Sequence, residues 1–382
     1  MKIFISAAEP SGDIIAGEVM DYLPSNTVYL GIGGVEMQKR GLKSLFPMEE
    51  LSVMGFLEVV PRYLNIRKRL FETVDKILKE NPSVVLTVDA YSFHVRLAEQ
   101  LRQRGFKGRL CHYVSPSVWA WKKGRAKELA CFYDEVYCIF PFEPAYFEPY
   151  NIRAEFVGHP AAFRLPAPDP SFRHRYRLND APILMILPGS RLQEIDKLYE
   201  VFIKASEIAR QTYPDLQIVV PTLPHLVTTI EAINQRLNAH VTLITDCQDR
   251  FACFSQARVA LAASGTVALE LALNKIPCVI GYKTSAVTYF LAKCFAKVKY
   301  ITVLNIMANK ELIPEFLQDL CTPENLAQSL EICLQQTDLT SQSKEVELQT
   351  ALLKKATGLK PQEIVANRLL NARIDDCKSK DD

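Results

Sequence analysis

The chain has 382 residues, enough for two or three domains with ample cores, and its net charge of +2 disfavours nucleic acid as the main partner. Its ten cysteines are scattered without a Cys-x-x-Cys pair, which is typical of reduced core residues in a cytoplasmic protein, although bridges between some of them stay open. The first apolar run is too short for a secretory signal, and no run reaches the ~20 residues of a membrane-spanning helix.

Short apolar strands alternate with helical patterns in two halves of the chain. The strands predicted in the first half are Lys2–Ala7, Val28–Gly31, Val84–Asp89, Leu110–Val114 and Glu135–Phe140. Those predicted in the second half are Ile183–Leu187, Gln217–Val220, Val241–Ile244, Val259–Ala262 and Cys278–Gly281. Apolar runs without alternation are typical of strands that are buried on both faces, as in parallel sheets.

A proline-rich stretch, LPAPDPSF from Leu165, separates the halves and is predicted to be a linker. The pattern predicts an α/β protein with two Rossmann-like doubly wound domains, residues 1–165 and 166–355, that face each other across a cleft. Residues 356–382 are expected to hold a C-terminal helix, Pro361–Ile374, and a solvated tail. This helix either packs on its own chain or is exchanged with another subunit.

The first predicted strand ends in an acidic turn, AEPSGD. A helix start attracts anions, so a loop that binds diphosphate should not carry the two carboxylates of Glu9 and Asp13. Together with Ser11 and Gly12, these acids are expected to hold a neutral, hydroxyl-rich group.

The stretch from Leu51 to Phe71 mixes apolar side chains with a basic cluster. An apolar face beside such a cluster is how proteins lie on anionic bilayers, whereas the packing of two ordinary helices is the alternative. The residues expected to contact the membrane or acyl chains are Met54, Phe56, Leu57, Val60, Arg62, Leu64, Arg67, Lys68 and Arg69.

Two further strand ends carry side chains suited to a sugar. Asp89 ends a buried-type strand, where it is predicted to be a general base toward a hydroxyl, or else the cap of the next helix. The segment HYVSPSVWAWKKGR follows the next strand. Its Ser115, Trp119 and Trp121 are expected to bind a sugar ring, with core packing of the tryptophans as the alternative.

The second half contains two turns that could bind a diphosphate. Gly189, Ser190 and Arg191 follow one strand, and Ser264, Gly265 and Thr266 follow another and start a helix without a carboxylate in the turn.

Glu270 lies one helical turn after Thr266 and could accept hydrogen bonds from ribose hydroxyls. An ordinary capped helix and a solvated arginine are the alternatives. The chain has no P-loop motif, no Asp-x-Asp and no histidines at ligand spacing, so no metal is expected.

Taken together, these stretches resemble the bacterial lipid A disaccharide synthases. The resemblance runs from Ile3 to about Pro361. It rests on AEPSGD, MEELSVMGFLEV, VDAYSF, HYVSPSVWAWKKGR, FVGHP, LPGSR, ASGTVALE and LAK…YITVLNIM.

The resemblance implies a B-type glycosyltransferase fold with the active site between its two domains. It implies transfer of diacylated glucosamine from its UDP derivative to the 6-hydroxyl of 2,3-diacylglucosamine 1-phosphate. The anomeric carbon is inverted, UDP leaves, and neither a cofactor nor a metal is needed. It also implies a peripheral position on the cytoplasmic face of the inner membrane, and a monomer or a dimer that exchanges its C-terminal parts.

Residue by residue, the resemblance makes Asp89 the base and Glu9 an acceptor-side carboxylate. Arg191, Glu270 and Asn305 match positions that are tied to UDP binding or activity. Ser92 stands where the family has a second Asp, and the segment PRYLNIRKR matches a lipid-facing patch.

Two rival functions are open at this point. A UDP-sugar 2-epimerase would keep the fold but need no lipid, and the membrane-facing stretch argues against it. A non-catalytic protein that binds a UDP-lipid at the membrane surface would not need a base such as Asp89.

Overall fold

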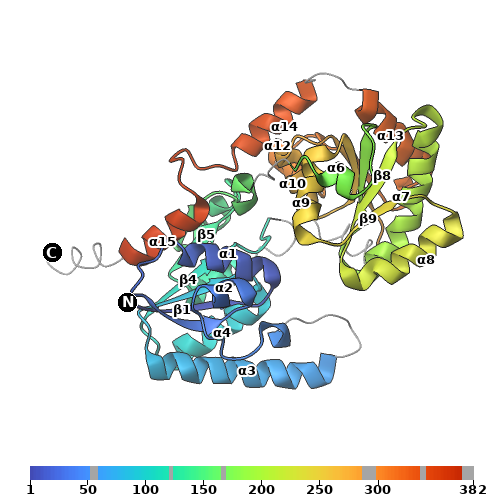
Figure 1. Cartoon of the computed structure of the whole chain (residues 1–382). Helices are drawn as coiled ribbons and strands as arrows, with labels where there is room; N and C mark the ends of the chain where they lie inside the picture. The colour runs from blue at the N-terminus through green and yellow to red at the C-terminus, as the bar shows by residue number, and fades with distance from the viewer. Residues whose placement is uncertain (52–58, 120–123, 165–168, 286–297, 336–340, 372–382) are drawn as a thin grey trace. The chain divides into compact units, whose positions relative to one another are not determined.

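The computed structural model describes residues 1–51, 59–119, 124–164, 169–285, 298–335 and 341–371 (Figure 1). The chain divides into two compact units, Met1–Pro160 with the chain from Leu353 onward, and Ala161–Leu352. Each unit is built on one six-stranded sheet in which all neighbouring strands are parallel. The predicted α/β class with two Rossmann-like units is therefore confirmed.

The sheet of the first unit has the strand order β2-β1-β3-β4-β5-β6. Every residue of β3 is buried because helices cover both faces of the sheet, which explains the unbroken apolar run VVLTV. The strands are β1 (Lys2–Ala7), β2 (Val28–Ile32), β3 (Val84–Val88), β4 (Arg109–Tyr113), β5 (Glu135–Cys138) and β6 (Arg153–Phe156).

Helices of the first unit form two layers. One layer contains α1 (Pro10–Met20), which contacts α2 (Val35–Lys39) and α15 (Pro361–Asn371). The other contains α4 (Tyr91–Gln103), which contacts α3 (Val59–Glu80) and α5 (Gly124–Phe132). Right-handed crossovers produce this division, because the chain moves one way from β1 to β2 and the opposite way from β3 to β5.

The C-terminal helix α15 completes the core of the first unit of its own chain (Figure 1). Ile364, Val365 and Leu369 are buried among the core side chains. On the polar side of the helix, Arg368 forms an ion pair of 2.8 Å with Glu155 of β6. Segments that are distant in sequence, the first helix and the last, therefore share one hydrophobic layer.

The sheet of the second unit has the order β12-β11-β10-β7-β8-β9. Counted within the unit, this is the 3-2-1-4-5-6 order of dinucleotide-binding folds read from the other edge. The strands are β7 (Ile183–Leu187), β8 (Gln217–Pro221), β9 (Thr242–Ile244), β10 (Val259–Ala263), β11 (Cys278–Tyr282) and β12 (Glu315–Leu317).

Two helical layers cover this second sheet as well. The helix α7 (Leu192–Thr212) contacts α8 (Val227–Leu237) and α13 (Pro323–Gln335). The helix α14 (Ser341–Ala351) contacts α10 (Thr266–Leu273) and α12 (Val303–Ala308). Among the described residues of this unit, α6 (Phe172–Arg175) and α9 (Cys247–Gln256) contact each other.

The ten predicted strands all form, with ends that differ by at most two residues. The structure adds β6 and β12, which lie at sheet edges. Their residues are mostly half-buried, and each strand is only three or four residues long, so neither carries the apolar run by which the other strands were predicted. Within the predicted linker, Phe172 is fully buried and starts α6.

Candidate active site

Four of the candidate loops lie where the strand order of each sheet reverses. In the first unit β1 lies beside β3, and Ala7 is paired with Val88, so the AEPSGD turn and Asp89 follow neighbouring strands. In the second unit β7 lies beside β10, and Leu187 is paired with Ala262, so the turns after Leu187 and Ala263 are also neighbours. Open α/β sheets bind ligands beyond the carboxyl ends of their strands at such reversal points.

Asp89 is half-buried at the carboxyl end of β3, next to the AEPSGD turn. A Cβ atom added to Gly12 would lie 3.8 Å from the Cβ of Asp89 and 3.3 Å from the carbonyl oxygen of Val88, so the two segments are in close contact. Burial raises the pKa of the Asp89 carboxyl. The hydrogen bond that this carboxyl accepts from the backbone N–H of Ala90 lowers the pKa, but by less. A carboxyl of this kind is suited to accept a proton from a hydroxyl.

The backbone at this strand edge is strained. Asp89, Ala90 and Val114 have φ angles of 54°, 43° and 70°, in the left-handed region that favours glycine. Such a conformation is most costly for Val114, because its side chain is β-branched. Strain concentrated at the ends of β3 and β4 is a feature of functional sites, where surrounding contacts hold it in place.

Asp13 has a structural task, which differs from the sugar contact expected for it. The residue is only 4% exposed, and its carboxylate accepts the backbone N–H groups of Gly34 (2.8 Å), Glu36 (2.9 Å) and Met37 (3.1 Å) at the start of α2. These bonds occupy both carboxylate oxygens. Glu9 and Ser11 are exposed on the same turn, so of its two acids only Glu9 stays a candidate for substrate contact.

An aromatic group follows β4 and β5. Trp119 packs edge-on against Phe140 and Phe142, with ring centroids 6.4 and 5.7 Å away. Its indole N–H lies 3.4 Å from the buried carboxyl of Glu143. Ser115 is buried and donates to the carbonyl of Pro116, and Trp121 lies outside the described residues. This packing agrees with the core alternative for Trp119.

Glu143 anchors the aromatic group and was not found by sequence reasoning. Its carboxyl accepts the N–H groups of Ile139 (3.0 Å) and Phe140 (3.1 Å), which ends β5 two residues before the predicted limit. Burial raises its pKa to about 8, against the opposing effect of these hydrogen bonds. The available signal was an acid that comes soon after an apolar strand.

The Glu143→Gln variant is expected to gain stability over the wild type as pH rises. The folded wild type keeps the carboxyl protonated up to a pKa of about 8, whereas the unfolded chain ionises near its ordinary value of about 4.5. By linkage, the free energy of unfolding of the wild type therefore decreases as pH rises from about 4.5 to about 8. The neutral amide of the variant does not titrate, so it contributes no such decrease. Urea unfolding at pH 5 and pH 8 measures this, and an equal difference between the two proteins at both pH values would contradict it.

The turn after β7 already contains an anion. Glu194, in the first turn of α7, accepts the N–H groups of Ser190 (2.9 Å) and Arg191 (3.2 Å). Gly189 has a φ of 119°, and a Cβ there would lie 2.2 Å from the Glu194 carboxylate. The sequence predicted that this turn could bind a diphosphate. Glu194 already accepts the N–H groups of Ser190 and Arg191, so these two groups are not open to one. The Arg191 side chain is 81% exposed and can reach a ligand.

The turn after β10 keeps the features of an anion site. Gly265 and Thr266 are exposed, and the helix α10 starts at Thr266. Glu270 lies one turn along this helix, 3.6 Å from the guanidinium of Arg250. Burial raises the pKa of Glu270, and the nearby Arg250 and Arg164 oppose that effect.

Asn305 organises the chain before β12, in contrast to the contact with UDP implied for it. It is fully buried, its amide oxygen accepts the N–H groups of Leu312 (2.7 Å) and Ile313 (2.9 Å), and its amide nitrogen donates to Glu315 (2.8 Å). Glu315 also accepts two N–H groups at the start of α12, including that of Thr302. Any influence of Asn305 on a ligand is therefore exerted through this loop.

The predicted membrane-facing stretch is described from α3 onward. Leu64 and Phe71 are 63% and 37% exposed, and the exposed Arg67 and Lys68 lie between them on the same side of the helix. Arg69, in contrast, is held by Glu50 (2.8 Å), so its charge is used within the fold. Outside the described side chains lie Met54, Phe56, Leu57, Val60 and Arg62.

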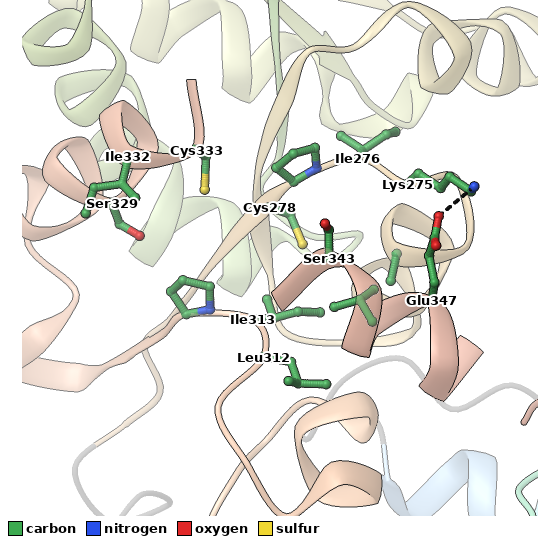
Figure 2. A pocket seen from close by; sticks show the side chains of 14 residues that line it. Lys275, Ile276, Cys278, Leu312, Ile313, Ser329, Ile332, Cys333, Ser343 and Glu347 are labelled. Atoms are coloured by element: carbon green, nitrogen blue, oxygen red, sulfur yellow. Dashed lines mark ion pairs between the residues drawn. The ribbon is translucent and has the colours of Figure 1, made fainter. Parts of the chain in front are cut away.

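A separate pocket of about 190 Å³ lies at the opposite end of the second sheet (Figure 2). It is formed by residues at the amino ends of β11 and β12, among them Cys278 and Ile313, together with Cys333 of α13 and Val346 of α14. Lys275 and Glu347 form an ion pair of 2.7 Å beside it. Because ligands of these sheets bind at the carboxyl ends, this pocket is not part of the candidate site.

In the described part of the chain, no helix combines the length and the hydropathy that a membrane span requires. Within the same residues, no group of three or more His, Cys, Asp and Glu side chains is arranged to hold a metal ion.

Solved structures resemble this chain over nearly its full length at low sequence identity. The UDP-GlcNAc 2-epimerase from Neisseria meningitidis bound to UDP-GlcNAc has a TM-score of 0.64 at 11% identity, covering 97% of this chain and 100% of that one. The trehalose 6-phosphate synthase from Burkholderia multivorans has a TM-score of 0.60 at 15% identity, covering 97% and 99%. These likenesses establish the B-type glycosyltransferase and epimerase fold alone.

Sequence relatives identify the family. The lipid-A-disaccharide synthase of Rhodospirillum centenum is 42% identical over 335 residues, covering 86% of this chain and 83% of that protein. The enzyme of the same name from Nitrobacter winogradskyi is 36% identical over 382 residues, covering 97% and 95%. The model of the lipid-A-disaccharide synthetase family matches residues 3–368. The chain therefore belongs to the lipid-A-disaccharide synthetase family.

Proposed function

We propose that the protein is an inverting glycosyltransferase that makes the lipid A disaccharide. It transfers 2,3-diacylglucosamine from its UDP derivative to the 6-hydroxyl of 2,3-diacylglucosamine 1-phosphate. The new bond joins the hydroxyl oxygen to the anomeric carbon, the bond from that carbon to UDP breaks, and UDP takes the electron pair. Family membership supports this reaction, and the observation that carries it is the half-buried carboxyl of Asp89 at the strand reversal of the first unit, beside the AEPSGD turn.

In this proposal Asp89 accepts the proton of the attacking hydroxyl, because its raised pKa brings its basicity closer to that of a working general base. Glu9, exposed on the neighbouring turn, accepts a hydrogen bond from the acceptor sugar. Both groups come from the first unit, which would make that unit the acceptor half of the enzyme.

The second unit supplies the UDP site. The start of α10 at Gly265 and Thr266, with Ser264 before it, directs N–H groups and hydroxyls toward the diphosphate. The Arg191 guanidinium stabilises the charge that grows on UDP as it leaves. Glu270, one turn further along α10, accepts the ribose hydroxyls. The chemistry needs neither a metal nor a cofactor in this proposal.

The outer side of α3 is the proposed contact with lipid, on the cytoplasmic face of the inner membrane. Exposed Leu64 and Phe71 would enter the interface while Arg67 and Lys68 meet anionic head groups. Both substrates carry acyl chains, so an enzyme held at the bilayer surface meets them where they reside. The enzyme would work as a monomer or as a dimer that exchanges α15.

The Glu270→Gln variant is expected to bind UDP about tenfold more weakly, because a neutral amide accepts weaker hydrogen bonds from ribose than a carboxylate does. Calorimetry with UDP measures the affinity. The matched control is Glu200→Gln, a surface helix position of the same unit that pairs with Arg236 (2.6 Å). Equal UDP affinity of wild type and Glu270→Gln would remove Glu270 from the ribose site.

The reaction itself is tested by UDP release from UDP-2,3-diacylglucosamine in detergent, with and without 2,3-diacylglucosamine 1-phosphate. Release that requires the acceptor, with the disaccharide identified by mass spectrometry, is the expected result. Release or epimerisation of a soluble UDP-sugar without any acceptor would favour the epimerase. Binding of UDP without turnover of either substrate would favour a binding protein.

A further inference from the structure

The His94 side chain contacts the backbone of Asp89 at the carboxyl end of β3. His94 lies in the first turn of α4, its side chain is fully buried, and its Nδ1 is 2.7 Å from the carbonyl oxygen of Asp89. Its Nε2 is 2.9 Å from the hydroxyl of Ser6 on β1. The imidazole therefore spans the strand reversal, with one nitrogen on each of the two segments that form the candidate site.

These two contacts define the tautomer of His94. A carbonyl oxygen only accepts hydrogen bonds, so Nδ1 carries the proton and donates it to Asp89. Burial lowers the pKa of His94 to about 4, so the ring is neutral at pH 7 and Nε2 accepts the Ser6 hydroxyl. Both ring nitrogens are thus used in holding the two segments.

The Asp89 peptide needs such a hold. Its φ of 54° lies in the left-handed region, which residues other than glycine populate sparsely, and its own N–H is already engaged with the carbonyl of Tyr113 on β4 at 2.9 Å. The Asp89 peptide is therefore held between β4 on one side and His94 on the other.

We propose that His94 is a positioning residue, whose Nδ1 proton holds the Asp89 peptide in its left-handed conformation and thereby directs the Asp89 carboxyl toward the acceptor hydroxyl. This inference rests on the proposed function and deepens it. It does not make His94 a proton-transfer group, since the bonds at both of its nitrogens lie within the fold.

Two amide variants test the contacts of the two ring nitrogens of His94 one at a time. In His94→Asn the amide nitrogen takes the place of Nδ1, so the bond to Asp89 is retained and the one to Ser6 is lost. In His94→Gln the amide lies at the place of Nε2, so the Ser6 bond is retained and the one to Asp89 is lost. We expect kcat to stay within about threefold of wild type in His94→Asn and to fall about 10- to 100-fold in His94→Gln, with KM nearly unchanged in both.

Tyr133→Phe is the control for a merely structural effect. It removes the hydroxyl that bonds to the His94 carbonyl, so it should lower the unfolding midpoint without a comparable loss of kcat. Equal kcat in wild type and His94→Gln, or equal losses in the Asn and Gln variants, would overturn the inference.

A readout that needs no turnover keeps this test separate from the proposed function. The ¹⁵N shifts of His94 should show a protonated Nδ1 and an unprotonated Nε2. The Asp89 carboxyl ¹³C shift should stay unchanged in the Asn variant and move in the Gln variant. An unchanged Asp89 signal in the Gln variant would contradict the inference, whether or not the wild type is active. A wild type without disaccharide synthesis would contradict the proposed function alone.

Discussion

Replacing Asp89 by asparagine is expected to slow disaccharide synthesis by about 10²- to 10⁴-fold, the usual contribution of a general base. Asparagine has nearly the same shape and can still accept the N–H of Ala90, but it cannot take a proton from the acceptor hydroxyl. Because the proposed UDP contacts all lie in the second unit, UDP affinity should stay unchanged. The measurements are kcat from UDP release and the Kd of UDP.

The pH profile offers a second check on Asp89. Its pKa lies above the ordinary value because of burial, so the group is protonated and inactive at low pH and becomes active as pH rises through its raised pKa. We expect kcat/KM to have an acid limb in the wild type that is absent from the residual activity of the asparagine variant.

Ser92→Ala is the matched control for the asparagine variant. Ser92 lies three residues from Asp89, in the first turn of α4, and is exposed, so its loss should change kcat by less than about twofold. An Asp89→Asn enzyme with substantial turnover would show that another group accepts the proton.

The Asp13→Ala variant is expected to destabilise the first unit by about 2–4 kcal/mol, because three N–H groups at the start of α2 lose their acceptor. At 4% exposure the site gives water little access to replace the carboxylate. Gly34 packs against the Asp13 carboxylate, since a Cβ atom at Gly34 would lie 2.7 Å from one of the carboxylate oxygens. Removing the carboxylate therefore also leaves a small void. Urea unfolding followed by circular dichroism measures the loss.

Asp21→Ala serves as the control for Asp13. Asp21 also meets α2, through its ion pair with Arg40 (2.7 Å), but its side chain is 49% exposed. Pairs at such exposure contribute about 0–1 kcal/mol. If Asp13→Ala unfolds no more easily than Asp21→Ala, the capping role assigned to Asp13 is wrong.

Local chemistry made the sheets and the position of Asp89 predictable. Strands such as Val84–Val88 and Ile183–Leu187 are buried on both faces, so their sequences are unbroken apolar runs, and the catalytic candidates come where those runs stop. The edge strands β6 and β12 lacked this signal because they are short and mostly half-buried.

Apolar runs and local motifs are properties of neighbouring residues, so the fold class, the family and the loops that follow the central strands could be predicted from the sequence. What each loop residue does depends on the partners that folding brings to it. Asp13 and Asn305 are used for hydrogen bonds inside the fold, and Glu194 occupies the turn that was expected to bind phosphate. Such partners lie 3 to 24 residues apart in the chain, or 88 in the case of Ser6 and His94, and which polar groups meet depends on packing.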